Sequence, residues 1–289
     1  MWKQEYKRYL KSKSGYGIVL ILLIIASCSF YFSYQDRQIF IDQTSNPAPD
    51  LNMTALLQLI RNYSCFSFLN DFWFVSDFFI IFATALFLWI GVFLSPIAAV
   101  NRQNGLGNLL VTRLTYRRYA DGLWLAQSLY IATIVGISML GSLLLACCWG
   151  GVHFDYVEIA EYHLGLGGAI TVWLLQTILI ILECIFINGI CLFTDAWVKN
   201  KYMIQLLPVV LFVLVPFFLA STIGNIIPGT AEFFTLLLPW ASFRSIENIF
   251  QEQFSSLSVL EFVAPVLIYA VIQLIIRHLN IKKISESYV

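Results

Sequence analysis

The sequence predicts an all-α integral membrane protein with six transmembrane helices and both termini in the cytoplasm. Hydrophobic residues make up 59% of the chain and charged residues only 12%, which is expected where a bilayer excludes charge. Six apolar stretches, each roughly 19–27 residues long, can cross about 30 Å of hydrocarbon as helices. These stretches are 16–34, 78–100, 122–148, 167–193, 202–220 and 257–276.

The basic residues predict the orientation, because they gather on one side of these stretches. Four patches hold all but three of the 17 Lys and Arg residues: Lys3, Lys7, Arg8, Lys11 and Lys13; Arg102, Arg113, Arg117 and Arg118; Lys199 and Lys201; Arg277, Lys282 and Lys283. The alternate loops carry most of the acidic residues. Cytoplasmic loops are the ones enriched in Lys and Arg, so the four patches are expected inside the cell.

Residues 1–15 are expected to contain a short helix lying on the inner membrane surface. Trp2, Tyr6 and Tyr9 are spaced to share one helical face, whereas Lys3 and Lys7 share another. This pattern is typical of an interfacial amphipathic helix. The alternative is a basic flank that only anchors the first span.

The segment 221–256, before the last span, is predicted to form an extracellular re-entrant hairpin. Its apolar run from Phe233 to Trp240 is too short to span a membrane and contains Pro239. Pro208 and Pro216 predict a kink in the span before it. We find no repeat and no soluble domain, so residues 1–289 are interpreted as a single transmembrane domain.

The inner loop at 101–121 has a helical pattern of its own. Leu106, Leu110 and Leu114 repeat at intervals of four, and Arg113 and Arg117 are also four apart. Such spacing predicts a short amphipathic helix with an apolar ridge beside a basic one.

Motifs for independent chemistry are absent from the sequence. It has no GxxxxGK[ST] phosphate loop, no HExxH and no GxSxG, so we expect neither an enzyme nor a bound cofactor. The net charge of zero gives no reason to expect a nucleic-acid partner. The six cysteines contain no CxxC pair and suggest neither a zinc site nor a disulfide framework. His153 and His163 could bind a metal with the acids between them, but a solvated acidic loop is the preferred interpretation and no metal is expected.

Glu183 is the one acid near the middle of a span. A lone carboxylate in a bilayer is costly, so it should be protonated, partnered or facing a polar path. One interpretation places it on a translocation pathway or a subunit interface. The other is structural, with a protonated Glu183 bonded to a neighbour such as Asn188.

The stretch from Asn101 to Tyr119 resembles the coupling-helix region of ABC-2 type transporter permeases. In that family a small polar turn after the second span leads into a short helix with a Thr-Arg element, here Thr112-Arg113, and then to a basic and an aromatic residue. The six-span layout, the N-terminal helix and the hairpin before the last span are also similar. The sequence departs from the family pattern in two places: no acid lies near 101–103, and Asp121-Gly122 replaces the Lys often found there.

The resemblance implies a permease subunit in a bacterial cell membrane, driven by ATP and Mg in a separate cytoplasmic ATPase present in two copies. It implies that six side chains contact that ATPase: Leu106, Leu110, Arg113, Leu114, Arg117 and Arg118. It further implies a second permease subunit, identical or homologous, with the pathway between the two.

The expected substrate is an amphiphilic molecule, such as a peptide, bacteriocin or drug, that is exported across the membrane. Membrane lipids are expected to contact the subunit. Export of a glycan or lipid-linked substrate is an alternative within the same class. A non-transporting membrane sensor or immunity protein, and a polytopic membrane enzyme, are the alternatives outside it.

Overall fold

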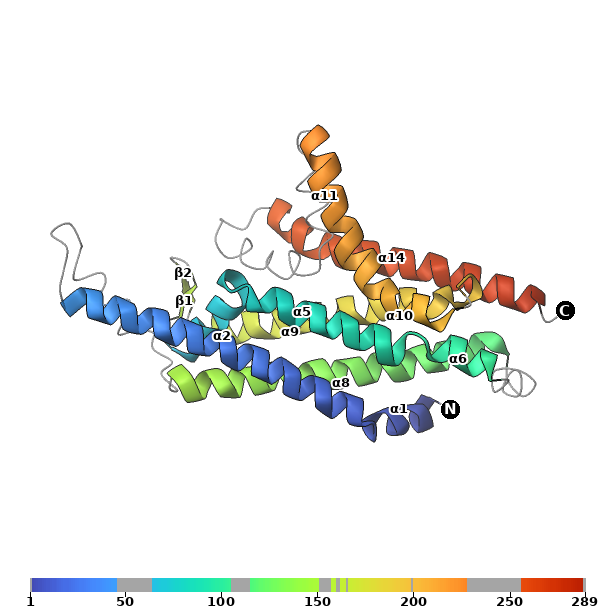
Figure 1. Cartoon of the computed structure of the whole chain (residues 1–289), viewed down its shortest axis with the longest axis horizontal. Helices are drawn as coiled ribbons and strands as arrows, with labels where there is room; N and C mark the ends of the chain where they lie inside the picture. The colour runs from blue at the N-terminus through green and yellow to red at the C-terminus, as the bar shows by residue number, and fades with distance from the viewer. Residues whose placement is uncertain are drawn as a thin grey trace.

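The computed structural model describes residues 2–45, 64–104, 115–150, 157–159, 162–164, 166–198, 200–227 and 256–287. Across these residues the chain is helical except for one pair of short strands. Six of the described helical stretches are long and apolar enough to cross a membrane. The predicted class, a helical protein with six candidate spans, is therefore confirmed. Both chain ends lie at the same end of the bundle, beside α6 (Figure 1).

The N-terminal segment forms α1 (Trp2–Leu10), which turns at Lys11 into the long α2 (Lys13–Ser45). The Tyr9 ring stacks on Tyr130 with the centroids 5.4 Å apart, and the Tyr6 hydroxyl lies 2.9 Å from Thr133 Oγ1. These contacts hold α1 against α8. A short amphipathic N-terminal helix is thus present, as predicted.

The first span is longer than the predicted 16–34. Helix α2 continues through polar residues to Ser45, because no glycine or proline interrupts positions 18–46 and Pro47 is the first residue that disfavours helix before it. The next described elements are α4 (Cys65–Asn70) and η1 (Asp71–Val75), which precede the second span.

The second span consists of α5 (Phe78–Trp89), the π-helical turn η2 (Ile90–Leu94) and α6 (Ile97–Gln103). In η2 the Ser95 amide donates to the Ile90 carbonyl five residues back, at 3.0 Å. Pro96 has no N–H, so the chain turns there before α6 begins.

The third and fourth spans are joined by the two strands. Helix α8 (Tyr116–Gly150) leads to β1 (Val157–Ile159), which pairs antiparallel with β2 (Tyr162–Leu164). Helix α9 (Leu166–Phe193) follows and ends in the 3₁₀ turn η3 (Thr194–Ala196).

The fifth span bends, as the two prolines predicted. It consists of α10 (Lys201–Val209), the π-helical turn η4 (Val210–Leu214) and α11 (Val215–Ile226), with Pro208 and Pro216 on either side of η4. Figure 1 shows α11 turning away from the rest of the bundle. Residues 221–226, expected in the re-entrant segment, continue α11, because the next proline after Pro216 is Pro228 and a proline disfavours helix at the residue before it. The rest of the predicted hairpin, 228–255, lies outside the described residues.

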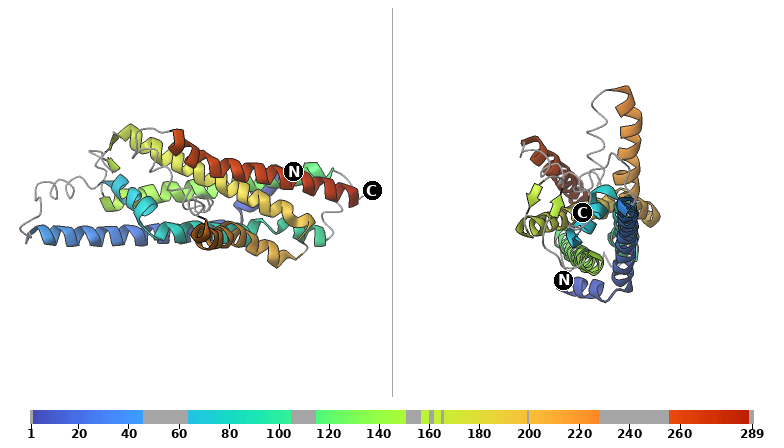
Figure 2. Two further views of the ribbon diagram at one scale, coloured as in Figure 1. Left: turned by 90° about the horizontal axis from the view of Figure 1, so that it is seen from above. Right: turned by 90° about the vertical axis from the view of Figure 1, so that its left-hand side faces the viewer.

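The last span is α14 (Ser256–Ser287). Among the described pairs of elements, α14 and α9 form the most extensive contact. Figure 2 shows these two helices running side by side. The interior between the helices is formed largely by aromatic and aliphatic side chains, including Phe30, Phe72, Leu86 and Tyr130, all 1% exposed or less.

Candidate functional site

The two ends of the segment 101–121, which is predicted to be an inner loop, are each tied to other helices. One end is the last turn of α6 and the other is the first turn of α8. Residues 105–114, which include Leu106, Leu110, Arg113 and Leu114, lie outside the described residues. Arg117 and Arg118 form part of α8 itself, and both are exposed.

A buried polar network joins α6 and α8 to α14 and η3. Arg102 of α6 forms a salt bridge with Asp195 of η3 (Nη1 to Oδ2, 3.4 Å) and also donates to the Asp195 carbonyl. Asn280 of α14 donates to Asp195 Oδ1 at 2.6 Å and to the Phe193 carbonyl at 2.6 Å. The Tyr116 hydroxyl donates to Asn280 Oδ1 at 2.9 Å. We call these residues, Arg102, Tyr116, Asp195 and Asn280, the loop-base network.

The central acid and amide of this network are shielded from solvent. Asp195 is 1% exposed and Asn280 is fully buried, so the charge of Asp195 is compensated by Arg102 and by donated hydrogen bonds rather than by water. Buried pairs of this kind depend on every partner being present. A change that separates α6 from α9 would leave a buried carboxylate with fewer partners.

A second link holds α8 to α14. Arg277 donates two hydrogen bonds to Asp121, Nε to Oδ1 and Nη2 to Oδ2, both 2.7 Å long. Bidentate pairs of guanidinium and carboxylate are among the stronger and more directional ion pairs. Arg117 Nε lies 3.9 Å from the same carboxylate. The Asp121–Arg277 pair therefore fixes the start of α8 against α14.

Deeper in the bundle, Gln127 of α8 connects three other elements. Its Nε2 donates to the Leu94 carbonyl at 2.8 Å and to the Tyr9 hydroxyl at 3.2 Å. Its Oε1 accepts from Asn188 of α9 at 2.9 Å, and Ser95 donates to Asn188 Oδ1 at 3.4 Å. Leu94 ends η2, where the helix is interrupted, so its carbonyl is available to Gln127.

This set, which we call the Gln127 network, is also buried: Gln127, Asn188 and Ser95 are each 0% exposed. It brings the N-terminal helix α1 into contact with the interior through Tyr9. Burial raises the pKa of the Tyr9 hydroxyl well above its usual range, because the interior would not solvate a phenolate.

Glu183 lies inside the subunit, fully buried between α9 and α14. Tyr269 of α14 is close enough to interact with it electrostatically. The Asn188 amide, named above as a possible partner for Glu183, donates to Gln127. Gln176 of α9 and Gln273 of α14 are also buried, and Gln273 lies against Gly189 of α9. Glu183 is therefore enclosed within its own subunit.

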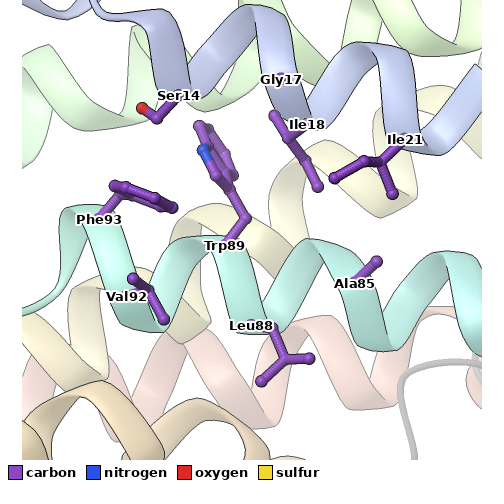
Figure 3. A pocket seen from close by; sticks show the side chains of 9 residues that line it. All are labelled: Ser14, Gly17, Ile18, Ile21, Ala85, Leu88, Trp89, Val92 and Phe93. Atoms are coloured by element: carbon purple, nitrogen blue, oxygen red, sulfur yellow. The ribbon is translucent and has the colours of Figure 1, made fainter.

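An apolar cavity of about 350 Å³ lies between α2 and the second span. Figure 3 shows its lining: Ser14, Gly17, Ile18, Ile21, Ala85, Leu88, Trp89, Val92 and Phe93. Ser14 is the only polar side chain among them. Lys13, which immediately precedes it in the sequence, is exposed. The cavity therefore suits an apolar group and not water.

The structure describes only part of the segment that was predicted to be a histidine-containing outer loop. Glu158 and His163 are paired positions in the β1–β2 register, and His153, Asp155 and Glu161 lie outside the described residues. Within the described ranges, no three His, Cys, Asp or Glu side chains come together to hold a metal ion.

The sequence did not identify most of the partners in the two networks and in the Asp121–Arg277 pair. Asp121 and Asp195 lie at the ends of predicted spans. Gln127 is a polar residue within an apolar span, which is a signal in itself, and Asn188 was named only as a possible partner of Glu183. Their partners are 33 to 118 positions away in the sequence, so no local pattern could identify them.

Comparison of the chain with protein-family models and with curated protein sequences gives no match.

Proposed function

We propose that this chain is the transmembrane permease subunit of an ATP-binding cassette transporter. In this proposal, a separate ATPase binds the inner loop at 101–121 and moves it during ATP hydrolysis. The observation that carries the proposal is the linkage of both ends of that loop to other spans, through the loop-base network and the Asp121–Arg277 pair. The proposal also depends on the resemblance of Asn101–Tyr119 to the family's coupling region.

The linkage gives a physical route from the loop to the bundle. Because Arg102 is bound to Asp195 and Tyr116 to Asn280, displacement of the loop ends must either move η3 and α14 with them or break buried polar bonds. Breaking such bonds leaves uncompensated polar groups in a low-dielectric interior. The lower-energy response is a joint movement of α6, α8, α9 and α14.

The proposed orientation places this end of the bundle in the cytoplasm. The two chain ends and α6 share one end of the bundle (Figure 1), and the basic residues Arg102, Arg117 and Arg277 lie on the elements that meet there. Excess Lys and Arg is typical of the cytoplasmic side. In the same proposal α1 lies in the inner interface, and the segment 228–255 forms the extracellular re-entrant hairpin.

A second permease subunit, identical or homologous, completes the proposed pathway. The fifth span is the least buried of the six described candidate spans, and α11 exposes large apolar side chains such as Phe217 and Phe218. These residues suit contact with a second subunit within the bilayer. Glu183 is fully buried within its own subunit, so its proposed role is inside the subunit, where it moves with α9.

The proposed cargo is amphiphilic, such as a peptide, bacteriocin or drug. The apolar cavity between α2 and the second span supports this class, because its apolar lining suits the apolar part of such a molecule. A glycan-linked lipid is the second candidate, since its acyl portion has the same chemistry.

The test is affinity purification of the tagged chain from its native membrane in mild detergent, followed by mass spectrometry. We expect a soluble ATPase with a GxxxxGK[ST] motif in stoichiometric amount. The double variant Arg113→Glu, Arg117→Glu is expected to lose this partner. The matched control, Lys3→Glu with Lys7→Glu, reverses two exposed charges on α1 and is expected to retain it.

Two outcomes would contradict the proposal. Purification of the chain without any ATPase, in several detergents, would favour the sensor or immunity interpretation. If the Arg113 and Arg117 double variant recovers as much ATPase as its control, the basic residues of the 101–121 loop are not required for ATPase binding.

A further inference from the structure

Two cysteines far apart in the sequence meet at the end of the bundle opposite the loop-base network. Helix α4 crosses the last turn of α8, and the backbones approach closely there. A Cβ placed on Gly150 would lie 2.8 Å from the Cys65 amide nitrogen and 2.9 Å from the Ser64 carbonyl carbon. Because position 150 is glycine, α4 can rest directly on this face of α8.

Cys147 is on that same face, three residues before Gly150, and residues three apart are neighbours on a helix surface. Cys147 is the neighbouring titratable group that acts most strongly on the Cys65 thiol, so the two side chains are close to each other. Neither forms a disulfide in this structure. Cys148, the next residue, points about 100° around the helix axis from Cys147 and is exposed.

We infer that Cys65 and Cys147 form a disulfide that fastens α4 to α8 on the extracytoplasmic side of the membrane. The inference rests on the proposed orientation, since disulfides persist in oxidising compartments and are rare in the cytoplasm. The sequence contains no CxxC pair and did not predict this disulfide.

The oxidant is a disulfide donor, either a dithiol–disulfide oxidoreductase or a small-molecule disulfide. Cys147, the more exposed thiol, loses its proton and attacks one sulfur of the donor, which releases one donor thiolate. Cys65 then loses its proton and attacks Cys147 Sγ, which releases the second donor thiolate. Two protons and two electrons leave the cysteine pair, and the donor disulfide is reduced to two thiols.

Burial affects the rate of the second step. Burial and the neighbouring Cys147 raise the pKa of the Cys65 thiol to about 12, so little of it is thiolate at neutral pH. Closure is therefore expected to be slow, and to accelerate as pH rises.

The disulfide would tie together segments separated by 82 positions. Cross-linking so long a loop restricts the unfolded chain strongly. It would also fix the start of the second span, because α4 leads through η1 into α5. Reduction is expected to lower the Tm of the purified protein by about 5 °C.

The first test uses the full-length purified protein in detergent, oxidised with glutathione disulfide. Differential alkylation and peptide mass spectrometry are expected to find a Cys65–Cys147 linked peptide. Cys65→Ser and Cys147→Ser are each expected to abolish it, and the adjacent control Cys148→Ser is expected to retain it. Absence of the linked peptide from oxidised wild-type protein, or linkage of Cys65 to Cys148 instead, would overturn the inference.

The second test uses intact cells with an oxidising exterior, in which thiols are blocked with a maleimide before lysis. We expect Cys65 and Cys147 to resist the maleimide until a reductant is added. If the purified protein forms the bond but both residues are fully reduced in cells, the extracytoplasmic placement is wrong. The permease function has its own test, in the recovery of the ATPase, so the two failures are distinguishable.

Discussion

Arg277 of α14 and Asp121 of α8 form a bidentate ion pair, 156 residues apart in the sequence, with both hydrogen bonds 2.7 Å long. The pair lies at the first turns of α8, next to the loop that we propose binds an ATPase. Asp121 belongs to the third span and Arg277 to the last, so loss of the pair is expected to loosen the contact between α8 and α14.

Replacing Asp121 with Asn is expected to weaken this connection. The variant removes the carboxylate but retains the shape of the side chain, and hydrogen bonds to charged groups contribute about 1.5–3 kcal/mol. Both side chains are partly exposed, so we expect a loss of about 1–2 kcal/mol, measured as a lower Tm in detergent.

The control for Asp121→Asn is Arg117→Gln. Arg117 also approaches Asp121, but at 3.9 Å and with a side chain 70% exposed. The Arg117→Gln variant is therefore expected to change the Tm little. If Arg117→Gln is as destabilising as Asp121→Asn, the bidentate pair is not the main contact at this position.

Gln127→Leu is expected to destabilise the protein by about 2–3 kcal/mol. Leucine fills similar space but leaves the Leu94 carbonyl and the Asn188 amide without their bonds to Gln127 in a buried site. Tyr9→Phe removes only the 3.2 Å bond and should cost less. Ser128→Ala is the control, because Ser128 bonds only within its own helix, to the Trp124 carbonyl, among the contacts described for it. Thermal unfolding followed by intrinsic fluorescence measures all three.

Gly91→Ala is expected to force α10 away from η2. A Cβ at this position would overlap the backbone carbonyl oxygen of Gln205, which cannot rotate aside as a side chain can. Overpacking of this kind costs about 1–3 kcal/mol. Gly136→Ala is the matched control, because a Cβ there meets nothing within 4 Å; alanine also favours helix, so its Tm should be equal or higher. Equal Tm values for the two variants would contradict the close contact.

Asp71 predicts a pH dependence of stability. Burial raises its pKa from 3.8 to about 6, opposed by a hydrogen bond from Ser33 and assisted by the nearby charge of Asp36. An acid with a raised pKa binds its proton more tightly in the folded state, so its contribution is fully present below about pH 4 and is lost as pH rises to about 6. Above that range the contribution stays constant.

The measurement is Tm against pH for wild type and Asp71→Asn. The variant cannot ionise, so its Tm should exceed that of wild type above pH 6, with the difference shrinking toward pH 4. Asp77→Asn, at an exposed position, corrects for the general effect of removing a carboxylate. A Tm difference between Asp71→Asn and wild type that does not change with pH would show that Asp71 does not titrate with folding.

The sequence by itself determined the class of this protein and its span count. A bilayer admits long apolar helices and little charge, so the positions of six apolar stretches can be identified locally. The bend in the fifth span was likewise predictable, because Pro208 and Pro216 act on the backbone around them. The start of the N-terminal helix followed from the spacing of Trp2, Tyr6 and Tyr9.

Only the tertiary structure decided which polar residues meet. Asp121 gave no sequence signal that distinguished it from a boundary acid, because its partner Arg277 is 156 positions away. Gln127 could be recognised as polar within a span, but its partners depend on how η2, α1 and α9 pack around it. Cys65 and Cys147 meet because Gly150 lets two helices touch. Spans are specified by local transfer free energies, whereas these contacts arise from helix packing that brings distant segments together.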